Sequence, residues 1–500
     1  MKTCRPWAPL QSYLLPPSPL DWLPEGHLAF FVLEVVEQLD LEGIEGAMSE
    51  KDPRGERPYS PRMLLALVIY GYCVGVFSSR KLARETYEDV AFRVLAGQEH
   101  PHFTTINQFR LMHRRAISGL FVQSLELCRR AGLVKLGHVA LDGTKLLANA
   151  SMHKAMSYQR MKDDEARLRG EVEKMLARAD AVDEAEDARF GVGVAPEDLP
   201  KELQRRETRL QRLKEAKAAL EQEAREARAQ RLRDNVEHLN ANAANALFPQ
   251  SHRKVVATRA KKSAAQADLL DGGRRRRDDD DDDTPNGSAT GLPTHRVKTN
   301  LDGTPKPKAQ RNFTDPESRI MGKNGMYLQG YNAQVVVDDA YQVILAHGLS
   351  NQPPDQEYFA PLLQAAVANC GAAPKKVSAD AGYFSIENVK VCEALGVSPY
   401  ISVRRKAHDG RVRTRRVVPA QDAMRLKLES PDGRAVYARR KAIVEPVFGQ
   451  MKGARGFRRL SLRGRQKAAS EWGLVCLTHN LLKLFRAAWV PAGPRHLAPA

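Results

Sequence analysis

The sequence predicts an α/β fold in which a mixed sheet is preceded by an all-helical segment and interrupted by a long charged insertion. Three observations support this prediction. Apolar residues repeat at helical spacing between residues 24 and 132. Residues 160–235 are dense in Ala, Glu, Arg and Lys. Outside that stretch, strand-like apolar runs alternate with amphipathic segments, which is the pattern of an α/β domain.

The composition excludes a globally disordered chain and indicates a polyanionic partner. Apolar residues make up 42% of the 500 residues, which is enough for a sizeable core and two or three domains. The 78 Lys and Arg residues exceed the 60 Asp and Glu residues, so the net charge at pH 7 is +18. Such an excess is typical of proteins that bind nucleic acid or an acidic membrane surface.

Neither a membrane span nor a disulfide framework is expected. The longest apolar run, residues 63–77, is shorter than the roughly 18 residues that cross a bilayer. The N-terminus shows no apolar segment of a secretory signal. The 6 cysteines are far apart and include no C-x-x-C pair, which argues against a zinc module. A protein of the reducing cytosol is therefore expected.

The N-terminal segment is expected to form four helices. One carries the apolar repeat of residues 28–39, and a second begins at Ser60-Pro61, an N-cap followed by proline at the first helical position. A third spans residues 79–96, and a fourth runs from the capping box Thr105-x-x-Gln108 to Gly132. A packed helical domain, a helix-turn-helix DNA binder and an oligomerisation domain all fit this pattern.

The insertion is expected to combine helices with a linker. Leucines and alanines step by threes and fours between Leu210 and Ala227, which indicates a weak coiled-coil seam or a helical hairpin. Further on, Arg274–Arg277 adjoin the aspartates Asp278–Asp283, and this block predicts a solvated linker. The aspartate run is not taken as a metal site, because adjacent carboxylates in an unfolded run have no fixed geometry.

The segments around the insertion form the α/β domain. A buried strand is expected at residues 138–145, before the insertion. After it we expect strands at 331–337 and 342–347, a helix at 355–367 that ends before Gly371, a strand at 376–380, a helix at 385–395, a strand at 398–403 and a long helix at 434–452. Asp355 is interpreted as the N-cap of the first of these helices.

Three acidic residues lie on or next to the expected strands and helices in positions that indicate a shared site. Asp142 lies on the first strand, Asp380 at the end of the fourth and Glu445 on the helix after the fifth. A single acid would be read as a turn or cap residue, but three that converge at one sheet edge would repel each other unless a cation bridged them. Mg²⁺ suits such a site, and two ions about 4 Å apart could act on a phosphodiester.

The motifs around these acids resemble the DDE transposases of bacterial insertion sequences. The resemblance covers nearly the whole chain. It rests on Leu141-Asp-Gly-Thr-Lys145, Gln329-Gly-Tyr-Asn332, Ala379-Asp-Ala-Gly-Tyr383, Val444-Glu-Pro-Val-Phe-Gly-Gln-Met-Lys452 and Arg455-Gly-Phe-Arg-Arg459. It implies a ribonuclease H-like catalytic domain, with Asp142, Asp380 and Glu445 as the catalytic, metal-binding triad. Two Mg²⁺ ions, or Mn²⁺ in their place, are implied as cofactors.

The resemblance also implies the reaction and the partners. Hydrolytic nicking at the ends of the element would be followed by attack of the freed 3′-hydroxyl on target DNA. The DNA partners would be the terminal inverted repeats and the target. A homodimer in the DNA complex and a cytoplasmic, nucleoid-associated place in a bacterium are further implications. A metal-dependent nuclease without strand transfer, and an inactive transposase-derived DNA-binding protein, are the alternatives.

A Tyr-Arg-Glu-Lys signature accompanies the glutamate in these enzymes. Its candidates are Tyr437, Arg440, Glu445 and Lys452, but Lys441 occupies the place four residues before the glutamate where the arginine is usual. Either cation could contact phosphate. Pro446 adds a second open question, because it could kink the helix or start a new one with Glu445 at its mouth.

Dense basic runs flank the acids in sequence and predict contacts with DNA phosphates. The first run includes Arg404, Arg405 and Lys406. The residues expected at the DNA are Tyr437, Arg440, Lys441, Lys452, Arg455, Arg458 and Arg459. The expected domains are a helical one at residues 1–133, the catalytic one at 134–150 with 313–488, and the insertion at 151–312.

Overall fold

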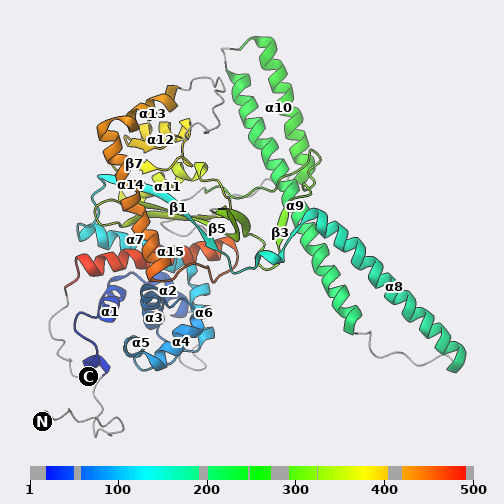
Figure 1. Ribbon diagram of the computed structural model, residues 1–500, viewed down its shortest axis with the longest axis horizontal. Helices are drawn as coiled ribbons and strands as arrows, with labels where there is room; N and C mark the ends of the chain where they lie inside the picture. The colour runs from blue at the N-terminus through cyan, green and yellow to red at the C-terminus, as the bar shows by residue number, and fades with distance from the viewer. Residues whose placement is uncertain are drawn as a thin grey trace, which may run out of the picture.

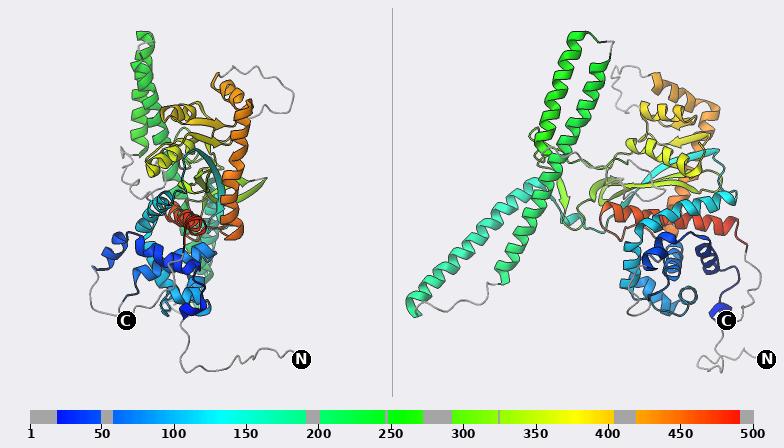
Figure 2. Two further views of the ribbon diagram at one scale, coloured as in Figure 1. Left: turned by 90° about the vertical axis from the view of Figure 1, so that its left-hand side faces the viewer. Right: turned by 180° about the vertical axis from the view of Figure 1, so that it is seen from behind.

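The computed structural model describes residues 19–49, 58–190, 201–245, 248–271, 292–323, 325–403 and 419–490. Figure 1 shows a body that contains the sheet and most of the helices, with two long helical hairpins projecting from one side. The views from the side and from behind show the same arrangement (Figure 2). The expected α/β class with a mixed sheet is confirmed.

The N-terminal part of the body is helical, as expected. After a short 3₁₀ turn, η1 (Pro19–Trp22), the helices are α1 (Leu28–Gln38), α2 (Glu42–Ser49), α3 (Pro61–Val74), α4 (Ser79–Glu88), α5 (Val90–Leu95), α6 (Phe103–Met112) and α7 (Arg114–Arg130). Among the described residues no single helix is long and apolar enough to span a membrane; α3 and α4 pass that test only together, as a pair bent by 96°.

Two of the expected helix boundaries are wrong. The helix expected at residues 79–96 is divided at Asp89, whose extended backbone ends α4 and whose carboxylate caps α5 by accepting from the Phe92 N–H at 3.1 Å. The capping box at Thr105 does not form, because α6 already begins at Phe103 with His102 as its N-cap. A break at His113 then separates α6 from α7.

The central sheet combines antiparallel and parallel strands. Its strands are β1 (His138–Leu147), β4 (Arg319–Lys323), β5 (Met326–Asp338), β6 (Ile344–Ser350), β7 (Lys376–Ala379) and β8 (Ser398–Ile401). Their order is β4-β5-β1-β7-β8, and β6 also pairs with β5. β5 runs antiparallel to β1, β4 and β6, whereas β7 runs parallel to β1 and β8 parallel to β7. The expected strands all form, and β4 is additional.

Helices cover both faces of this sheet. They are α11 (Phe359–Cys370), α12 (Ile386–Ala394), α13 (Pro419–Glu429), α14 (Pro431–Gly449) and α15 (Arg465–Ala487). Residues of β1 alternate between two hydrophobic clusters. Ala140 and Leu146 pack with α14, α15 and the N-terminal helices, whereas Val139 and Leu141 pack with α7, α11 and α12. The face of Ala140 is also the face of Asp142, because side chains alternate along a strand.

The long helix at the C-terminal end of the domain does not break at its proline. α14 begins after its N-cap Ser430 and continues through Pro446 to Gly449, where a π-helical turn, η5 (Gln450–Ala454), follows. The alternative that a new helix starts at Pro446 is therefore wrong. α15 closes the fold, and its His479 is buried between the Gln342 carbonyl at 2.9 Å and Gln450.

The described part of the insertion contains three long helices. α8 (Tyr158–Phe190) and α10 (Gln250–Asp271) pack along different parts of α9 (Lys201–Ala244), so that two hairpins share one helix (Figure 1). The expected seam is confirmed, since Leu210, Leu213, Leu220 and Ala224 lie in a small buried cluster. β2 (Ala155–Ser157) and β3 (Gln310–Asn312) pair at its base. Arg274–Asp283 lie outside the described residues.

Candidate active site

Asp142 and Asp380 come together where β1 and β7 run parallel. Leu141 lies opposite Ala379 in the register of the two strands, so the next residue of each strand is an aspartate. Burial raises the pKa of Asp142 above its ordinary value, and the charge of Asp380 adds to this rise. The Gly143 N–H, which donates to Asp142 Oδ1 at 2.8 Å, acts in the opposite direction. Two carboxylates held this close together are stabilised in their charged form by a nearby positive charge.

α14 supplies that charge from the face of the sheet that it covers. Arg440 Nη1 donates to Asp142 Oδ2 at 2.9 Å, and both side chains are largely buried. Further along, Lys452 Nζ donates to the hydroxyl of Thr144 and, at 2.9 Å, to the carbonyl of Lys145. The C-terminal half of α14 and the turn that follows it thus lie along β1 and bring two cations of the expected signature to it.

Glu445 lies between these two cations in sequence, at an exposed position of α14. Its neighbours Ile443 and Val444 are buried against the sheet, whereas Glu445 is exposed. A π-helical turn begins at Gln450, between Glu445 and Lys452, so the expectation that the two share an α-helical face does not hold. In the described part of the chain, no group of three or more Asp, Glu, His or Cys residues is placed to hold a metal ion. The structure places Asp142 and Asp380 close together, and Glu445 is exposed on α14.

Asp355, which the sequence alone predicts to be an N-cap, lies close to Asp142 and Asp380. Asp355 does not cap a helix with its side chain. Its Oδ1 instead accepts from Asn332 Nδ2 at 2.6 Å, Gln334 Nε2 at 2.9 Å and Lys145 Nζ at 3.3 Å. Asp355 thus occupies the expected N-cap position, before the short 3₁₀ turn η4 (Gln356–Tyr358) that leads into α11, but its carboxylate serves the cluster and makes no capping hydrogen bond. Asn332 and Gln334 are buried polar residues at alternate positions of an apolar strand. In the sequence, this pattern of polar residues within an apolar strand could have indicated a polar site at Asp355.

The side chains around Asp355 form one polar network at the sheet edge. The Tyr383 hydroxyl donates to Gln334 Oε1. Burial raises the pKa of Tyr383 well above its ordinary value, and the carboxylates of Asp355, Asp142 and Asp380 add to that rise. Burial lowers the pKa of Lys145, while the charge of Asp355 opposes this change. Three aspartates thus act on the same two side chains, although they are not grouped tightly enough for a shared ion.

Glycines permit the close approach that this network needs. A Cβ at residue 143 would lie 2.2 Å from Gln334 Nε2, so a side chain there would displace the amide. A Cβ at residue 382 would lie 2.9 Å from Asp380 Oδ1, which accepts from the Gly382 N–H at 2.7 Å. The glycines of the Asp-Gly-Thr and Asp-Ala-Gly-Tyr motifs therefore shape the site sterically.

One of the expected DNA contacts is wrong. Arg455 is 5% exposed and donates to Thr478 Oγ1 at 2.8 Å and to the carbonyls of Tyr72 and Val475 at 3.3 Å. Burial lowers its pKa to about 10. Its guanidinium joins α3 to α15 in the interior, where it cannot contact a phosphate.

The remaining basic candidates lie at or near the surface. Lys441, Arg458 and Arg459 are exposed. Tyr437 is half-buried, and the guanidinium of Arg440 lies over its ring, 5.8 Å from the centre of the Tyr437 ring. Arg440 is the cation that reaches Asp142, whereas Lys441 faces outward. The basic run that begins at Arg404 lies outside the described residues.

Comparison with known protein families identifies the chain. A family model described as a transposase DDE domain matches residues 289–481, and one described as a transposase domain (DUF772) matches residues 18–111. The chain belongs to the DDE transposases of insertion sequences. The first match includes Asp380 and Glu445 and begins after Asp142. The transposase matches no curated protein and no solved structure. As a transposase it is an enzyme of a mobile element and acts on DNA.

Proposed function

We propose that this transposase cleaves DNA at the ends of its insertion sequence and transfers the freed 3′-hydroxyl to target DNA by in-line attack. The observation that carries the proposal is the proximity of Asp142, on β1, to Asp380, at the end of the parallel neighbouring strand β7. A net charge of +18 supports a DNA substrate. A nuclease without strand transfer would have the same pair, and the joining assay below separates the two functions.

We propose a ribonuclease H-like catalytic domain as the framework for this chemistry. The order β6-β5-β1-β7-β8, with three antiparallel strands followed by two parallel ones, supports it. The proposed domains are the helical one at residues 1–133, the catalytic one at 134–150 with 313–488, and the insertion at 151–312. Since both ends of an element must be cut, we also propose a homodimer in the DNA complex, at work on the nucleoid of a bacterial cell.

Asp142 and Asp380 fit a divalent metal ion by their donor chemistry. Mg²⁺ is commonly held by one or two carboxylates, with water and phosphate oxygens in the remaining positions. We propose that these two aspartates and Glu445 hold Mg²⁺, with Mn²⁺ as a substitute, in a site for two ions. Bound ions would activate the attacking oxygen and stabilise the leaving oxygen of the phosphodiester. Glu445 is included because it lies, in the sequence, between Arg440 and Lys452, and both of these cations contact β1.

The side chains around the aspartates have distinct proposed tasks. Arg440 neutralises Asp142 in the structure and must release it before a ligand can use both oxygens. Lys145 and the amides of Asn332 and Gln334 hold Asp355 in place beside Gly382. Lys441, Arg458 and Arg459 are exposed and positively charged, so they are proposed to contact DNA phosphates.

Single substitutions of the acids test the proposal. Asp142→Ala, Asp380→Ala and Glu445→Ala are each expected to lower cleavage of a labelled element-end duplex by about 100-fold or more, because a metal ligand is lost. Binding of that duplex should change little. Glu429→Ala, an exposed acid on α13, is the matched control.

Each outcome bears on a different part of the proposal. Cleavage at the parental rate by the Asp142 or Asp380 variant contradicts the site, and parental cleavage by the Glu445 variant alone removes that residue from the set. Wild-type protein that cuts ends but never joins a 3′-hydroxyl to a second duplex is a nuclease.

A further inference from the structure

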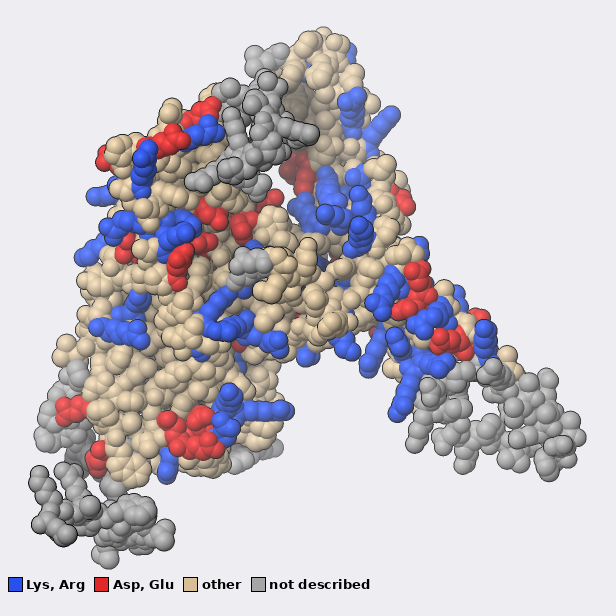
Figure 3. All heavy atoms as spheres, in the orientation of Figure 1, with Lys and Arg blue, Asp and Glu red and all other residues tan. Residues whose placement is uncertain are grey.

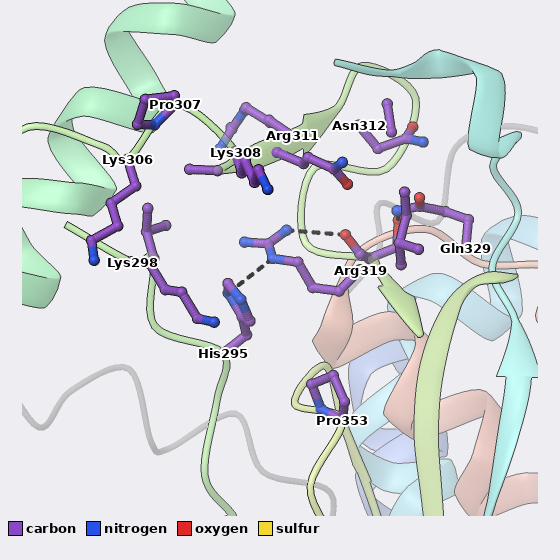
Figure 4. A pocket seen from close by; sticks show the side chains of 16 residues that line it. His295, Lys298, Lys306, Pro307, Lys308, Arg311, Asn312, Arg319, Gln329 and Pro353 are labelled. Carbon is purple, nitrogen blue, oxygen red and sulfur yellow. Dashed lines mark hydrogen bonds between the residues drawn. The ribbon is translucent and has the colours of Figure 1, made fainter. Parts of the chain in front are cut away.

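A basic pocket lies where the insertion joins the sheet. Its volume is about 600 Å³, and its lining comes from the β2–β3 base of the insertion, from the segment that returns to the sheet, and from β4 and β5. The positively charged side chains in this lining are Lys298, Lys306, Lys308, Arg311 and Arg319. Figure 4 shows them around one space together with His295. In Figure 3, Lys and Arg side chains also gather where the hairpins meet the body.

The charge of this pocket is only slightly compensated. Arg311 and Arg319 both pair with Glu223 of α9. Lys298, Lys306 and Lys308 are exposed, and no ion pair in the described residues includes them. Burial and the nearby cations lower the pKa of His295 to about 4, so its ring is neutral and adds no charge at neutral pH. An anion in the pocket would therefore meet several cations, with Glu223 and Glu317 as the carboxylates that act on Arg319.

Arg319 forms a fixed part of the pocket wall. It is 9% exposed, and its Nε donates to His295 Nδ1 at 3.2 Å. Its Nη1 donates to the carbonyls of Pro316 and Ser318, and its Nη2 lies 3.6 Å from Glu223. Because these contacts use most of its donors, Arg319 contributes positive charge to the pocket, whereas the exposed lysines are free to contact phosphate oxygens.

The pocket adjoins the aspartate cluster. Pro353 lines it, and the carbonyl of Pro353 accepts from Lys145 Nζ at 3.0 Å. Lys145 also contacts Asp355, which stands two residues after Pro353. Gln329 of the lining and Asn332 of the cluster belong to the same strand, β5. A DNA strand that reaches the aspartates would thus have its neighbouring phosphates within reach of the pocket.

We propose that this pocket binds a backbone phosphate of the DNA strand beside the scissile bond, and that the base of the insertion thereby positions the DNA in the active site. This inference rests on the proposed function. It assigns the base of the insertion a direct role in substrate binding. Inorganic phosphate has the same oxyanion chemistry, so the experiment must distinguish the two sources.

The test compares two triple variants of equal charge change. The pocket variant is Lys298→Ala with Lys306→Ala and Lys308→Ala, and the control is Lys81→Ala with Lys375→Ala and Lys390→Ala, three exposed lysines outside the pocket. Affinity for the element-end duplex is measured over a range of salt concentrations. The pocket variant should bind about 10-fold more weakly than the control, and the slope of log K against log salt should fall by about 1 per lost phosphate contact.

A second measurement identifies the source of the phosphate. The His295 ring is titrated by NMR in the free protein, with the duplex and with inorganic phosphate. A rise of the His295 pKa with the duplex, absent in the pocket variant, supports the proposal. Equal affinities and equal salt slopes for the two variants would overturn it, as would a His295 response to inorganic phosphate but not to DNA. If wild-type protein binds the duplex but never cuts it, the proposed function is refuted. The comparison of duplex affinity between the pocket variant and the control variant can still be interpreted in that case.

Discussion

At the residue scale, the pairing of Arg440 with Asp142 decides the charge state of the candidate site. Asp142 is about three-quarters buried, with 23% of its side chain exposed, and it stands beside a second aspartate. Burial raises its pKa, the neighbouring Asp380 raises it further, and Arg440 lowers it. The net effect raises the pKa of Asp142, so the folded protein holds this carboxyl proton more tightly than the unfolded chain does.

Removal of the arginine should make this effect larger. In Arg440→Gln the pKa of Asp142 should rise further, because burial and Asp380 remain while the compensating charge is lost. A carboxyl pKa raised by folding makes the folded state less stable as pH rises above the unfolded value of 3.8. The unfolding free energy of Arg440→Gln should therefore decline more steeply than that of wild type as pH is raised from about 4, as urea titrations can measure.

Arg439→Gln is the matched control, since Arg439 is adjacent on α14 and pairs with Asp339 at 2.8 Å instead. Its pH profile should follow wild type. A profile for Arg440→Gln that is flat, or identical to that of Arg439→Gln, would show that Arg440 does not compensate Asp142 in solution.

At the element scale, buried polar groups attach the N-terminal helices to the rest of the body. Glu471 of α15 accepts from the Ser461 N–H at 2.8 Å and from the Tyr72 hydroxyl of α3 at 3.3 Å. Arg110 of α6 lies 3.6 Å from the same carboxylate, and the side chains of the pair are 5% and 0% exposed. Three helices from distant parts of the sequence therefore depend on one buried charge pair.

Loss of this pair should be costly. Glu471→Gln leaves the Arg110 guanidinium buried without its counter-charge, and breaking such a pair typically costs about 3–5 kcal/mol. Glu45→Gln removes an exposed pair with Arg62 on α3, which should cost about 0–1 kcal/mol. Thermal unfolding of both variants measures the difference. A melting temperature for Glu471→Gln no lower than that of Glu45→Gln would refute the structural role of the buried pair.

At the scale of the whole molecule, the body and the insertion have separate hydrophobic cores. The helices and sheet of the body share two large clusters. The hairpins have two small ones, of which one contains Leu220 and the other Leu232. Because few apolar groups join these cores, the insertion can lose its packing while the body remains folded.

Leu220→Ala tests this separation. Leu220 is fully buried, so the change should destabilise the hairpins by about 2–5 kcal/mol. Amide hydrogen exchange should become faster in α8 and α9 and remain unchanged in the sheet. Val335→Ala in the body core is the comparison, and it should speed exchange throughout the sheet. Faster exchange in β1 and β5 of Leu220→Ala would show that the two parts unfold as one unit.

Much of the element order could be predicted because it depends on local patterns. The strands around Asp142 and Asp380 are short apolar runs bounded by turns, and the helices of the α/β domain end at glycines such as Gly371. The two wrong helix boundaries lie where one local signal competes with another signal nearby in the sequence. Asp89 divides an otherwise continuous helical pattern, and the Thr105 capping signal lies inside a helix that His102 already caps.

The candidate site could be predicted only in part. Asp142 and Asp380 could be predicted because each directly follows an apolar run, Asp142 within β1 and Asp380 at the end of β7, and the two runs pair in parallel. Asp355 was missed, because its partners Lys145, Asn332 and Gln334 come from two other strands. Arg455 lies in a run of basic residues, and its burial depends on α3 and α15, which are distant in sequence.

The sequence by itself determined the family, the α/β class, the order of most elements and the two aspartates that come after apolar runs, because motifs, periodicity and charge are local properties of the chain. Only the tertiary structure decided that Arg440 pairs with Asp142, that Asp355 joins the polar network beside the aspartates, that Glu445 is exposed and that a basic pocket forms at the base of the insertion. These features arise from side chains brought together across hundreds of residues, and burial and pairing exist only once the chain has folded.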